Sequence, residues 1–235
     1  MSETRIVGPA VSPFVVKTLA AADYKGFAYD HDEYVSIREL GRYNATTGKV
    51  PVALFDGEAV YDSTLILRRF DEIHPDKPLV SSDPAVAAHQ RILEDWADES
   101  LYWSVQAFRW HEKNEHRTIA QNARFVPAPM RIFAKPILRR LVGRQPRAQG
   151  MGRLPYEMLV RELGKRLDDL VVLLGRNPFF CSDKPSIADF AIYGQLCTGS
   201  SERVTPDFAE IVEQRGALEA WRSRLETAMG NSWYR

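Results

Sequence analysis

Two short polar motifs stand where helices are predicted to begin, and both could bind an anion. Ser12-Pro13 places a capping residue before a proline that suits the first helical position, and Asp62-Ser63 opens an amphipathic helix. The free N–H groups and the dipole of a helix N-terminus favour a carboxylate, and the Ser63 hydroxyl adds a donor. The residues alone leave an alternative open, in which both motifs only cap their own helices.

The turn signals and apolar patterns before residue 80 predict a small mixed sheet with helices. The expected elements are a strand over 4–8, a helix over 14–24 ended by Gly26, a strand over 27–29, a helical stretch over 37–43, strands over 52–55 and 59–61 joined by Asp56-Gly57, and a helix from 62–63. The first two strands imply a parallel pair with a right-handed crossover, and Asp56-Gly57 indicates an antiparallel hairpin. This β-α-β-α-β-β-α succession is the thioredoxin-like order.

The chain beyond Pro84 has the character of helices throughout. The expected segments are 84–115, 118–142, 155–174, 186–199 and 206–229, and Pro127, Pro129 and Pro136 must break or kink the second. The Pro- and Ser-rich stretch 74–84 is the expected boundary. The predicted fold class is therefore α/β followed by all-α, with a thioredoxin-like domain over 1–80 and an all-helical domain over 84–235.

The overall composition is that of an ordinary globular protein, with 45% apolar and 26% charged residues among 235. A formal net charge of zero provides no field that would attract nucleic acid. The chain shows no leading segment of the signal-peptide kind and no uncharged stretch long enough to cross a bilayer. Cys181 and Cys197 are too few for a disulfide framework. The expected location is the cytoplasm.

The charges are unevenly distributed along the chain. Residues 116–156 contain no Asp or Glu but carry nine basic side chains: Arg117, Arg124, Arg131, Lys135, Arg139, Arg140, Arg144, Arg147 and Arg153. Such a run is most often a solvated helix face with a basic loop. The alternative is a basic surface that attracts an anionic ligand, membrane or partner.

Three motifs of the first domain together resemble the glutathione transferase superfamily: Ser12-Pro13-Phe14, Lys49-Val50-Pro51 and Asp62-Ser63. The segment 184–190, Lys-Pro-Ser-Ile-Ala-Asp-Phe, is similar to the capping-box segment of that superfamily's helical domain. The segments 149–153, 173–175 and 179–185 are similar to the metaxin and failed-axon-connections branch, in which catalysis is less uniform and some members act at membranes.

The resemblance implies that the protein binds glutathione, which carries two carboxylates, an ammonium group and a thiol. It makes Ser12 the catalytic residue, next to the sulfur. It also implies a cis bond at Val50-Pro51, which frees the Val50 backbone to pair with the cysteinyl part. Lys49 then meets the glycine carboxylate, and the γ-glutamyl end lies at the start of the helix that Asp62-Ser63 opens. The expected glutathione-binding set is Phe14, Lys49, Val50, Pro51, Asp62, Ser63 and Arg38.

Trp96, Trp103 and Trp110 recur every seven residues along the first helix of the second domain. A stripe of this kind is more typical of core packing than of ligand binding. In the superfamily, however, this helix lines the pocket of an apolar co-substrate, so the resemblance makes Trp103 and Trp110 candidates for that pocket. Asp98 and Glu99 are either exposed helix acids or groups that reach the glutathione of a partner subunit.

Ser186-Ile-Ala-Asp189 has the form of a capping box, which predicts a structural role without a ligand. The five histidines lack metal-ligand spacing, the two cysteines do not form a CxxC motif, and the sequence contains no GxSxG, phosphate loop or GxGxxG. No metal is expected.

The leading hypothesis is a glutathione S-transferase that joins the glutathione thiolate, as co-substrate, to a small apolar electrophile. The resemblance also implies a homodimer. One alternative is a non-catalytic adaptor of the same fold that docks a membrane or protein partner, although membrane contact is not favoured. Another is a glutathione-dependent peroxidase or reductase, against which stands the absence of a cysteine at position 12.

Overall fold

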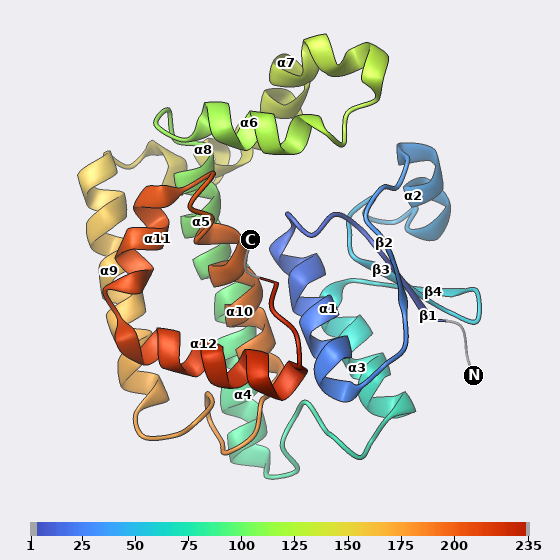
Figure 1. Cartoon of the computed structure of the whole chain (residues 1–235), viewed down its shortest axis with the longest axis vertical. Coiled ribbons are helices and arrows are strands. Elements are labelled where there is room, and N and C mark those ends of the chain that lie inside the picture. The colour runs from blue at the N-terminus through green and yellow to red at the C-terminus, as the bar shows by residue number, and fades with distance from the viewer. Residues whose placement is uncertain (1–3, 234–235) are drawn as a thin grey trace.

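The structure is a computed structural model that describes residues 4–233. Its first part contains β1 (Thr4–Val7), α1 (Pro13–Lys25), β2 (Asp30–Asp32), α2 (Ile37–Tyr43), β3 (Val52–Phe55), β4 (Glu58–Tyr61) and α3 (Ser63–Ile73). The strand order is β2-β1-β3-β4, in which β1 and β2 are parallel and the other neighbours are antiparallel. Helices α1 and α3 lie on the face of the sheet toward the helical part, and α2 lies on the other (Figure 1). The predicted thioredoxin-like order is confirmed.

The two faces of this sheet bury different clusters because successive side chains of a strand point to opposite sides. Ile6 and Phe55 belong to the main core, which includes residues of α1 and α3. Val7 and Leu54 belong to a smaller cluster, against which Leu40 of α2 packs. The strands are therefore covered on both faces, which explains why β3 is apolar along its whole length.

The second strand is the one element of this part that the sequence prediction misplaced. The prediction gave 27–29, whereas β2 pairs Ile6 with His31. The ring of Phe27 packs instead against Phe70 and His74, at centroid distances of 4.6 and 4.4 Å. The chain therefore packs Phe27 against the core before it pairs with β1. The pairing begins at Asp30, three residues later than predicted. Gly26, with φ of 77°, ends α1 as predicted.

The helical part follows from Pro84. It contains α4 (Pro84–Trp96), the π turn η1 (Ala97–Leu101), α5 (Tyr102–Arg109), α6 (Glu115–Ala123), the 3-10 segment η2 (Ala128–Phe133), α7 (Ala134–Leu138), the π turn η3 (Arg139–Gly143), α8 (Gln145–Gln149), the 3-10 turn η4 (Met151–Arg153), α9 (Tyr156–Leu174), α10 (Ile187–Gly199), α11 (Pro206–Glu213) and α12 (Gly216–Met229). The helices predicted over 155–174 and 186–199 are confirmed as α9 and α10.

The breaks that Pro127, Pro129 and Pro136 predict within 118–142 are confirmed, whereas the continuous helix predicted over 206–229 is wrong. The first segment is a succession of short pieces from α6 to η3, because Pro127, Pro129 and Pro136 interrupt the backbone hydrogen bonds. These pieces form a lobe that stands away from the rest of the helical part (Figure 1). The second segment is divided into α11 and α12, which a turn at 214–215 separates.

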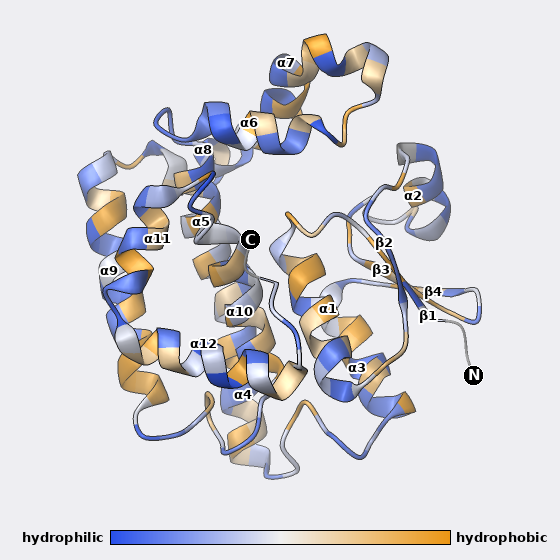
Figure 2. Ribbon diagram, in the orientation of Figure 1, coloured by the Kyte–Doolittle hydropathy of each residue, from blue (hydrophilic) through white to orange (hydrophobic). Residues whose placement is uncertain are grey.

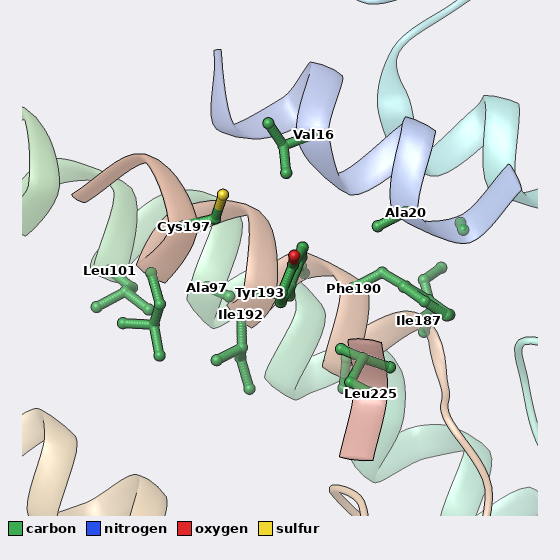
Figure 3. Close-up of a cluster of buried hydrophobic side chains, with 14 of the residues drawn as sticks. Val16, Ala20, Ala97, Leu101, Ile187, Phe190, Ile192, Tyr193, Cys197 and Leu225 are labelled. Carbon is green, nitrogen blue, oxygen red and sulfur yellow. The ribbon is translucent and has the colours of Figure 1, made fainter. Parts of the chain in front are cut away.

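Helix α1 of the sheet part packs directly on α10 of the helical part. A Cβ at Gly194 of α10 would lie 2.3 Å from the carbonyl oxygen of Pro13, so only glycine permits this approach. Beside this contact, Val16 of α1 and Phe190 and Tyr193 of α10 are fully buried in one cluster (Figure 3). The two parts therefore share one core.

The predicted capping box at the start of α10 is confirmed. Asp189 is fully buried, and its Oδ2 accepts hydrogen bonds from the backbone N–H and the hydroxyl of Ser186, both at 2.8 Å. Its Oδ1 accepts from the Phe180 N–H and the Trp221 indole at 2.9 and 2.8 Å. Burial raises the pKa of Asp189 to about 6 despite these donors. The residue thus joins α10, α12 and the loop before α10.

Among the helices of residues 4–233, none has the length and apolar character needed to span a membrane. Cys181 and Cys197 are not joined in a disulfide.

Candidate active site

Residues that the sequence analysis singled out from both parts line a single cavity of about 430 Å³, here called the first cavity. These residues are Ser12, Pro13, Phe14, Lys49, Val50, Asp98, Glu99, Trp103 and Trp110. From α2 the wall includes Leu40, whereas Arg38 is an exposed residue outside it. Pro51, Asp62 and Ser63 are also outside this wall, as far as the described residues form it. Arg38 as a helper for glutathione remains a prediction.

Ser12 occupies the capping position of α1 but does not use its hydroxyl as a cap. Its backbone is extended, its N–H donates to the Pro9 carbonyl at 2.9 Å, and its carbonyl accepts from the Val16 N–H at 3.1 Å. The hydroxyl makes no hydrogen bond within the described part of the chain. A polar group at the N-terminus of α1 is thus left available to a ligand in the first cavity.

The loop around Val50 is held by a buried side chain that the sequence analysis did not identify. Asn44 donates to Thr47 Oγ1 at 2.6 Å and to the Lys49 carbonyl at 3.0 Å, and it is only 1% exposed. The bond between Val50 and Pro51 is cis, as the resemblance implied. The side chain of Lys49 is exposed and forms no ion pair among residues 4–233, so its charge is available at the rim.

At the start of α3, Asp62 is the cap. It has a φ of 78°, and its Oδ1 accepts from the N–H groups of Thr64 and Leu65 at 3.0 and 3.4 Å. Ser63, the first helical residue, is 4% exposed, and its hydroxyl has no hydrogen-bond partner in the described chain. The capping role therefore belongs to the acid, which leaves the hydroxyl of Ser63 open to other uses.

Next to this helix start lies a buried charge cluster that the sequence analysis missed. The ammonium group of Lys17 lies 2.6 Å from Glu94 Oε1 and 2.6 Å from Asp98 Oδ2, and Thr64 donates to Glu94 at 2.6 Å. Burial alone lowers the pKa of Lys17, but the two carboxylates outweigh it and raise the pKa above its ordinary value. A lysine within the apolar helix α1, and acids four residues apart on another helix, were the signals in the sequence.

Asp98 belongs both to this cluster and to the wall of the first cavity. Its Oδ1 is buried without a hydrogen-bond partner in the described residues. Burial raises the pKa of Asp98 to about 6, against the opposing effect of Lys17, and nearby Glu94 and Asp62 contribute in the same direction as burial. The sequence analysis left two interpretations of Asp98 open, an exposed helix acid or a group that reaches the glutathione of a partner subunit. In the structure Asp98 lines the first cavity of its own chain.

The tryptophans separate onto two sides of the long helix because η1 interrupts its period. A π turn holds about one extra residue, which rotates the helix that follows by about 100°. Trp96, before the turn, faces a groove between α4 and α9. Trp103 and Trp110, after the turn, line the first cavity, where Tyr102 packs on Trp103 with a centroid distance of 4.9 Å. The predicted single stripe is wrong, and the two candidate residues lie in the cavity.

The sheet part matches a known family. Residues 11–73 match the sequence model described as Glutathione S-transferase, N-terminal domain. The chain is 33% identical over 106 residues to Glutathione transferase GST 23 of Zea mays, which is 42% of this chain and 48% of the maize protein. It is 28% identical over 202 residues to the isoprene-epoxide–glutathione S-transferase of Rhodococcus sp. (strain AD45), 80% of each chain.

The whole fold also matches a solved structure, the beta-etherase LigF from Sphingobium sp. strain SYK-6. The TM-score is 0.70 at 22% identity, with 97% of each chain covered. Many relatives match about half of their own length, as the maize protein does. Together these similarities support the glutathione transferase superfamily for the fold and the sheet part.

Within residues 4–233, no group of three or more His, Cys, Asp or Glu side chains is arranged to hold a metal ion.

Proposed function

We propose, from the premise of this similarity to the glutathione transferase superfamily, that the protein is a glutathione S-transferase that conjugates glutathione to a small electrophile. The observation that carries the proposal is the unused hydroxyl of Ser12. It stands at the N-terminus of α1 and lines the same cavity as Lys49, Val50 and the aromatic residues of α5. A thiol bound there meets a hydrogen-bond donor, the positive end of a helix dipole and an apolar surface for a second substrate.

In this mechanism the sulfur of glutathione lies next to Ser12. A free thiol with a pKa of about 8.5 is only a few per cent ionised at neutral pH. A hydrogen bond from Ser12, together with the α1 dipole, lowers that pKa by roughly two units, about 2.7 kcal/mol. The thiolate attacks the electrophilic carbon, a carbon–sulfur bond forms, and the leaving group departs with its bonding electrons. The protein contributes position and thiolate stabilisation.

The glycine end of glutathione carries a carboxylate, and the γ-glutamyl end carries a carboxylate and an ammonium group, so the site must supply both signs of charge. The rim ammonium of Lys49 suits the glycine carboxylate, and the unpartnered hydroxyl of Ser63 suits the γ-glutamyl carboxylate. The unpartnered Oδ1 of Asp98 and the nearby Asp62 suit the glutathione ammonium. The ring of Phe14 packs against the ring of Tyr102 at a centroid distance of 5.1 Å, and both residues line the first cavity.

Calorimetric titration with glutathione, followed by the ultraviolet absorbance of the bound thiolate, tests the proposal. In Ser12→Ala we expect the apparent thiol pKa at saturating glutathione to rise by the part of those roughly two units that the hydrogen bond contributes, because the α1 dipole remains. The free energy of unfolding should change by less than about 0.5 kcal/mol, because the hydroxyl makes no cap bond. An unchanged thiol pKa would leave Ser12 without the catalytic role, and no glutathione binding in the wild type would overturn the function.

A second candidate function is suggested by the basic lobe, which we define as residues 127–144. Its apolar side chains are unusually exposed, with Ile132 at 81%, Leu141 at 58% and Phe133 at 57%. They alternate with basic residues along the ribbon (Figure 2). This combination suits an anionic membrane surface, as in the adaptor alternative and the metaxin-like branch. Arg139 is already paired with Glu115, which reduces the charge available.

Sedimentation with vesicles tests this candidate. Binding to phosphatidylserine-containing vesicles that weakens with salt and is lost in an Ile132→Ser, Phe133→Ser double variant would support it. Equal co-sedimentation of the protein with neutral phosphatidylcholine vesicles would contradict binding of the basic lobe to an anionic membrane. No co-sedimentation with either kind of vesicle would contradict it too.

The remaining expectations are kept as parts of the proposal. The division into domains over 1–80 and 84–235 remains part of the proposal, and the family match over residues 11–73 falls within the first of them. The cytoplasmic location remains part of the proposal. A serine at position 12 continues to argue against the disulfide-exchange type of reductase.

A homodimer would cover an apolar groove of about 630 Å³ between α4 and α9. Three of its side chains are strongly exposed: Val172 at 77%, Ile92 at 68% and Leu173 at 58%. Sedimentation equilibrium should show a dimer for the wild type and a monomer for Val172→Asp, whereas a monomeric wild type would contradict this proposal.

A further inference from the structure

A second cavity, of about 520 Å³, adjoins the first. The two share Val11 and Arg109 in their walls, and Val11 is the neighbour of Ser12. The remaining wall comes from Ala10, from α6 and its C-terminal end, from the end of α10, from the loop after α10 and from Trp233 near the C-terminus. A molecule that reacts beside Ser12 therefore has room to extend past Val11 into this space.

All the charged side chains in the described wall of the second cavity are positive. Arg109, Arg117, Arg124 and Arg203 belong to its wall, and no carboxylate does, among the described residues. Arg124 is paired with Glu33 at 2.9 Å, outside the cavity. Arg117 contacts only the neutral amide oxygen of Asn114, and Arg203 forms no ion pair within residues 4–233. Three of the four guanidinium groups therefore lack an anionic partner there.

Arg109 is the most informative of these side chains because it is only 4% exposed. Its Nη1 donates to the Val11 carbonyl at 2.9 Å and its Nη2 to Gln121 Oε1 at 2.8 Å. Its Nε has no hydrogen-bond partner in the described chain. Burial lowers the pKa of Arg109 to about 10, which still leaves it charged at neutral pH. A buried cation without a counter-ion is unfavourable unless an anion joins it.

We propose that the second cavity binds an oxyanion, a carboxylate or a phosphate, carried by the electrophile whose reactive carbon lies at Ser12. Guanidinium groups recognise both oxyanions through paired N–H donors. The inference rests on the proposed transferase function and narrows its substrate class: the electrophile has an apolar body against Trp103 and Trp110 and an anionic end at Arg109. In that proposal both carboxylates of glutathione are bound elsewhere, at Lys49 and at the start of α3, so the second anion belongs to the other substrate.

A matched pair of electrophiles tests the charge requirement. In 4-chloro-3,5-dinitrobenzoate and its neutral methyl ester the thiolate displaces the same chloride, so a carbon–sulfur bond forms and chloride leaves. Comparing each variant with the wild type cancels the intrinsic reactivity of each compound. Binding of the unreactive 3,5-dinitrobenzoate and of phenyl phosphate, measured by calorimetry, shows which oxyanion the cavity prefers and needs no turnover.

The variants are Arg203→Gln and the Arg117→Gln, Arg203→Gln double variant, which leave the buried Arg109 in place. We expect kcat/KM for the benzoate to fall about fivefold in the first and about twentyfold in the second, and that for the ester to change less than twofold. Arg91→Gln, an exposed arginine of α4 outside both cavities, is the matched control for charge and should change neither.

Two results would overturn the inference: an equal fall for the benzoate and the ester, or 3,5-dinitrobenzoate and phenyl phosphate binding that the double variant does not weaken. These outcomes are distinct from failure of the transferase proposal, which would appear as no glutathione binding or no thioether from either compound. In that case the binding measurements still decide whether the arginine cavity takes an oxyanion.

Discussion

Two buried cations lie close to the first cavity, Arg109 in its wall and Lys17 behind Asp98, and they are compensated in opposite ways. Lys17 of α1 faces two carboxylates from the helical part and is 1% exposed. Arg109 of α5 reaches back to the Val11 carbonyl of the sheet part, but has only neutral acceptors in the described chain. Both residues connect the two parts of the molecule.

The difference separates a structural contact from a binding site. A buried ion pair whose partners are all present holds helices in a fixed relation, and removing one partner leaves an uncompensated charge. A buried cation that lacks its anion contributes little to the stability of the fold, so its presence is better explained by the binding of an anionic ligand. On this reasoning Lys17 stabilises the fold and Arg109 serves recognition, and three measurements test that distinction.

The largest effect is expected for Lys17→Met. The change leaves Glu94 and Asp98 facing each other without a cation, so the free energy of unfolding should fall by about 3–5 kcal/mol. Urea denaturation measures the loss. Lys165→Met, on the exposed face of α9, is a matched control that should cost less than about 0.5 kcal/mol. A loss for Lys17→Met no larger than the control would show that the cluster is not a structural contact.

A smaller effect is expected in the pH dependence that Asp98 gives the fold. Its pKa is about 6 in the folded protein and lies near 3.8 when unfolded, so the folded state holds the proton more tightly. The contribution of Asp98 to stability is therefore present at low pH, declines as pH rises from about 4 to about 6, and changes little above that. The decline amounts to roughly 2–3 kcal/mol.

Asp98→Asn should remove this decline, which denaturation midpoints between pH 4 and pH 7 will show. Asp189 has a pKa raised to about 6 in the same window, but it is present in both proteins and cancels in the difference. Parallel pH profiles for the wild type and the variant would mean that the buried pair does not titrate in this way.

The smallest effect on stability is expected for Arg109→Met. No carboxylate is left unpaired, and only the Val11 carbonyl and the Gln121 amide lose a donor, so the cost should be about 1 kcal/mol. The same variant should bind 3,5-dinitrobenzoate at least tenfold more weakly. A loss of stability as large as that of Lys17→Met, with oxyanion binding retained, would reverse the comparison and make Arg109 the structural residue.

The sheet wall of the cavity was predicted through the family resemblance, which rests on short local motifs. Ser12 and Val50 each stand beside a proline at the start of an element, and such signals depend only on neighbouring residues. The compensating partners are not local: Lys17 and Glu94 are 77 residues apart, and Arg109 and Val11 are 98 apart. A lysine within an apolar helix indicates a buried charge, but nothing in either segment alone indicates which partner it meets, so both pairings emerged only from the structure.

The errors on the helical wall have a different cause. The seven-residue spacing of Trp96 and Trp103 predicts one face under the ordinary period, and a single π turn is enough to separate them. The region from α6 to η3 contained the correct breaking signals in its prolines, but their combined effect on the path of the chain depends on packing that the sequence pattern does not describe. Asn44 was missed because its hydrogen bonds support a loop and follow no periodic pattern.

The close approach of Gly194 to Pro13 has a consequence for how the molecule comes apart. Since α1 is covered on one side by the sheet and on the other by α10, neither part keeps a complete core when the other is lost. Heating or denaturant should therefore melt the protein in a single cooperative transition, without a surviving half. For the same reason, a glutathione molecule bound at the N-terminus of α1 would protect amide hydrogens of α10 from exchange with solvent, although α10 does not touch it.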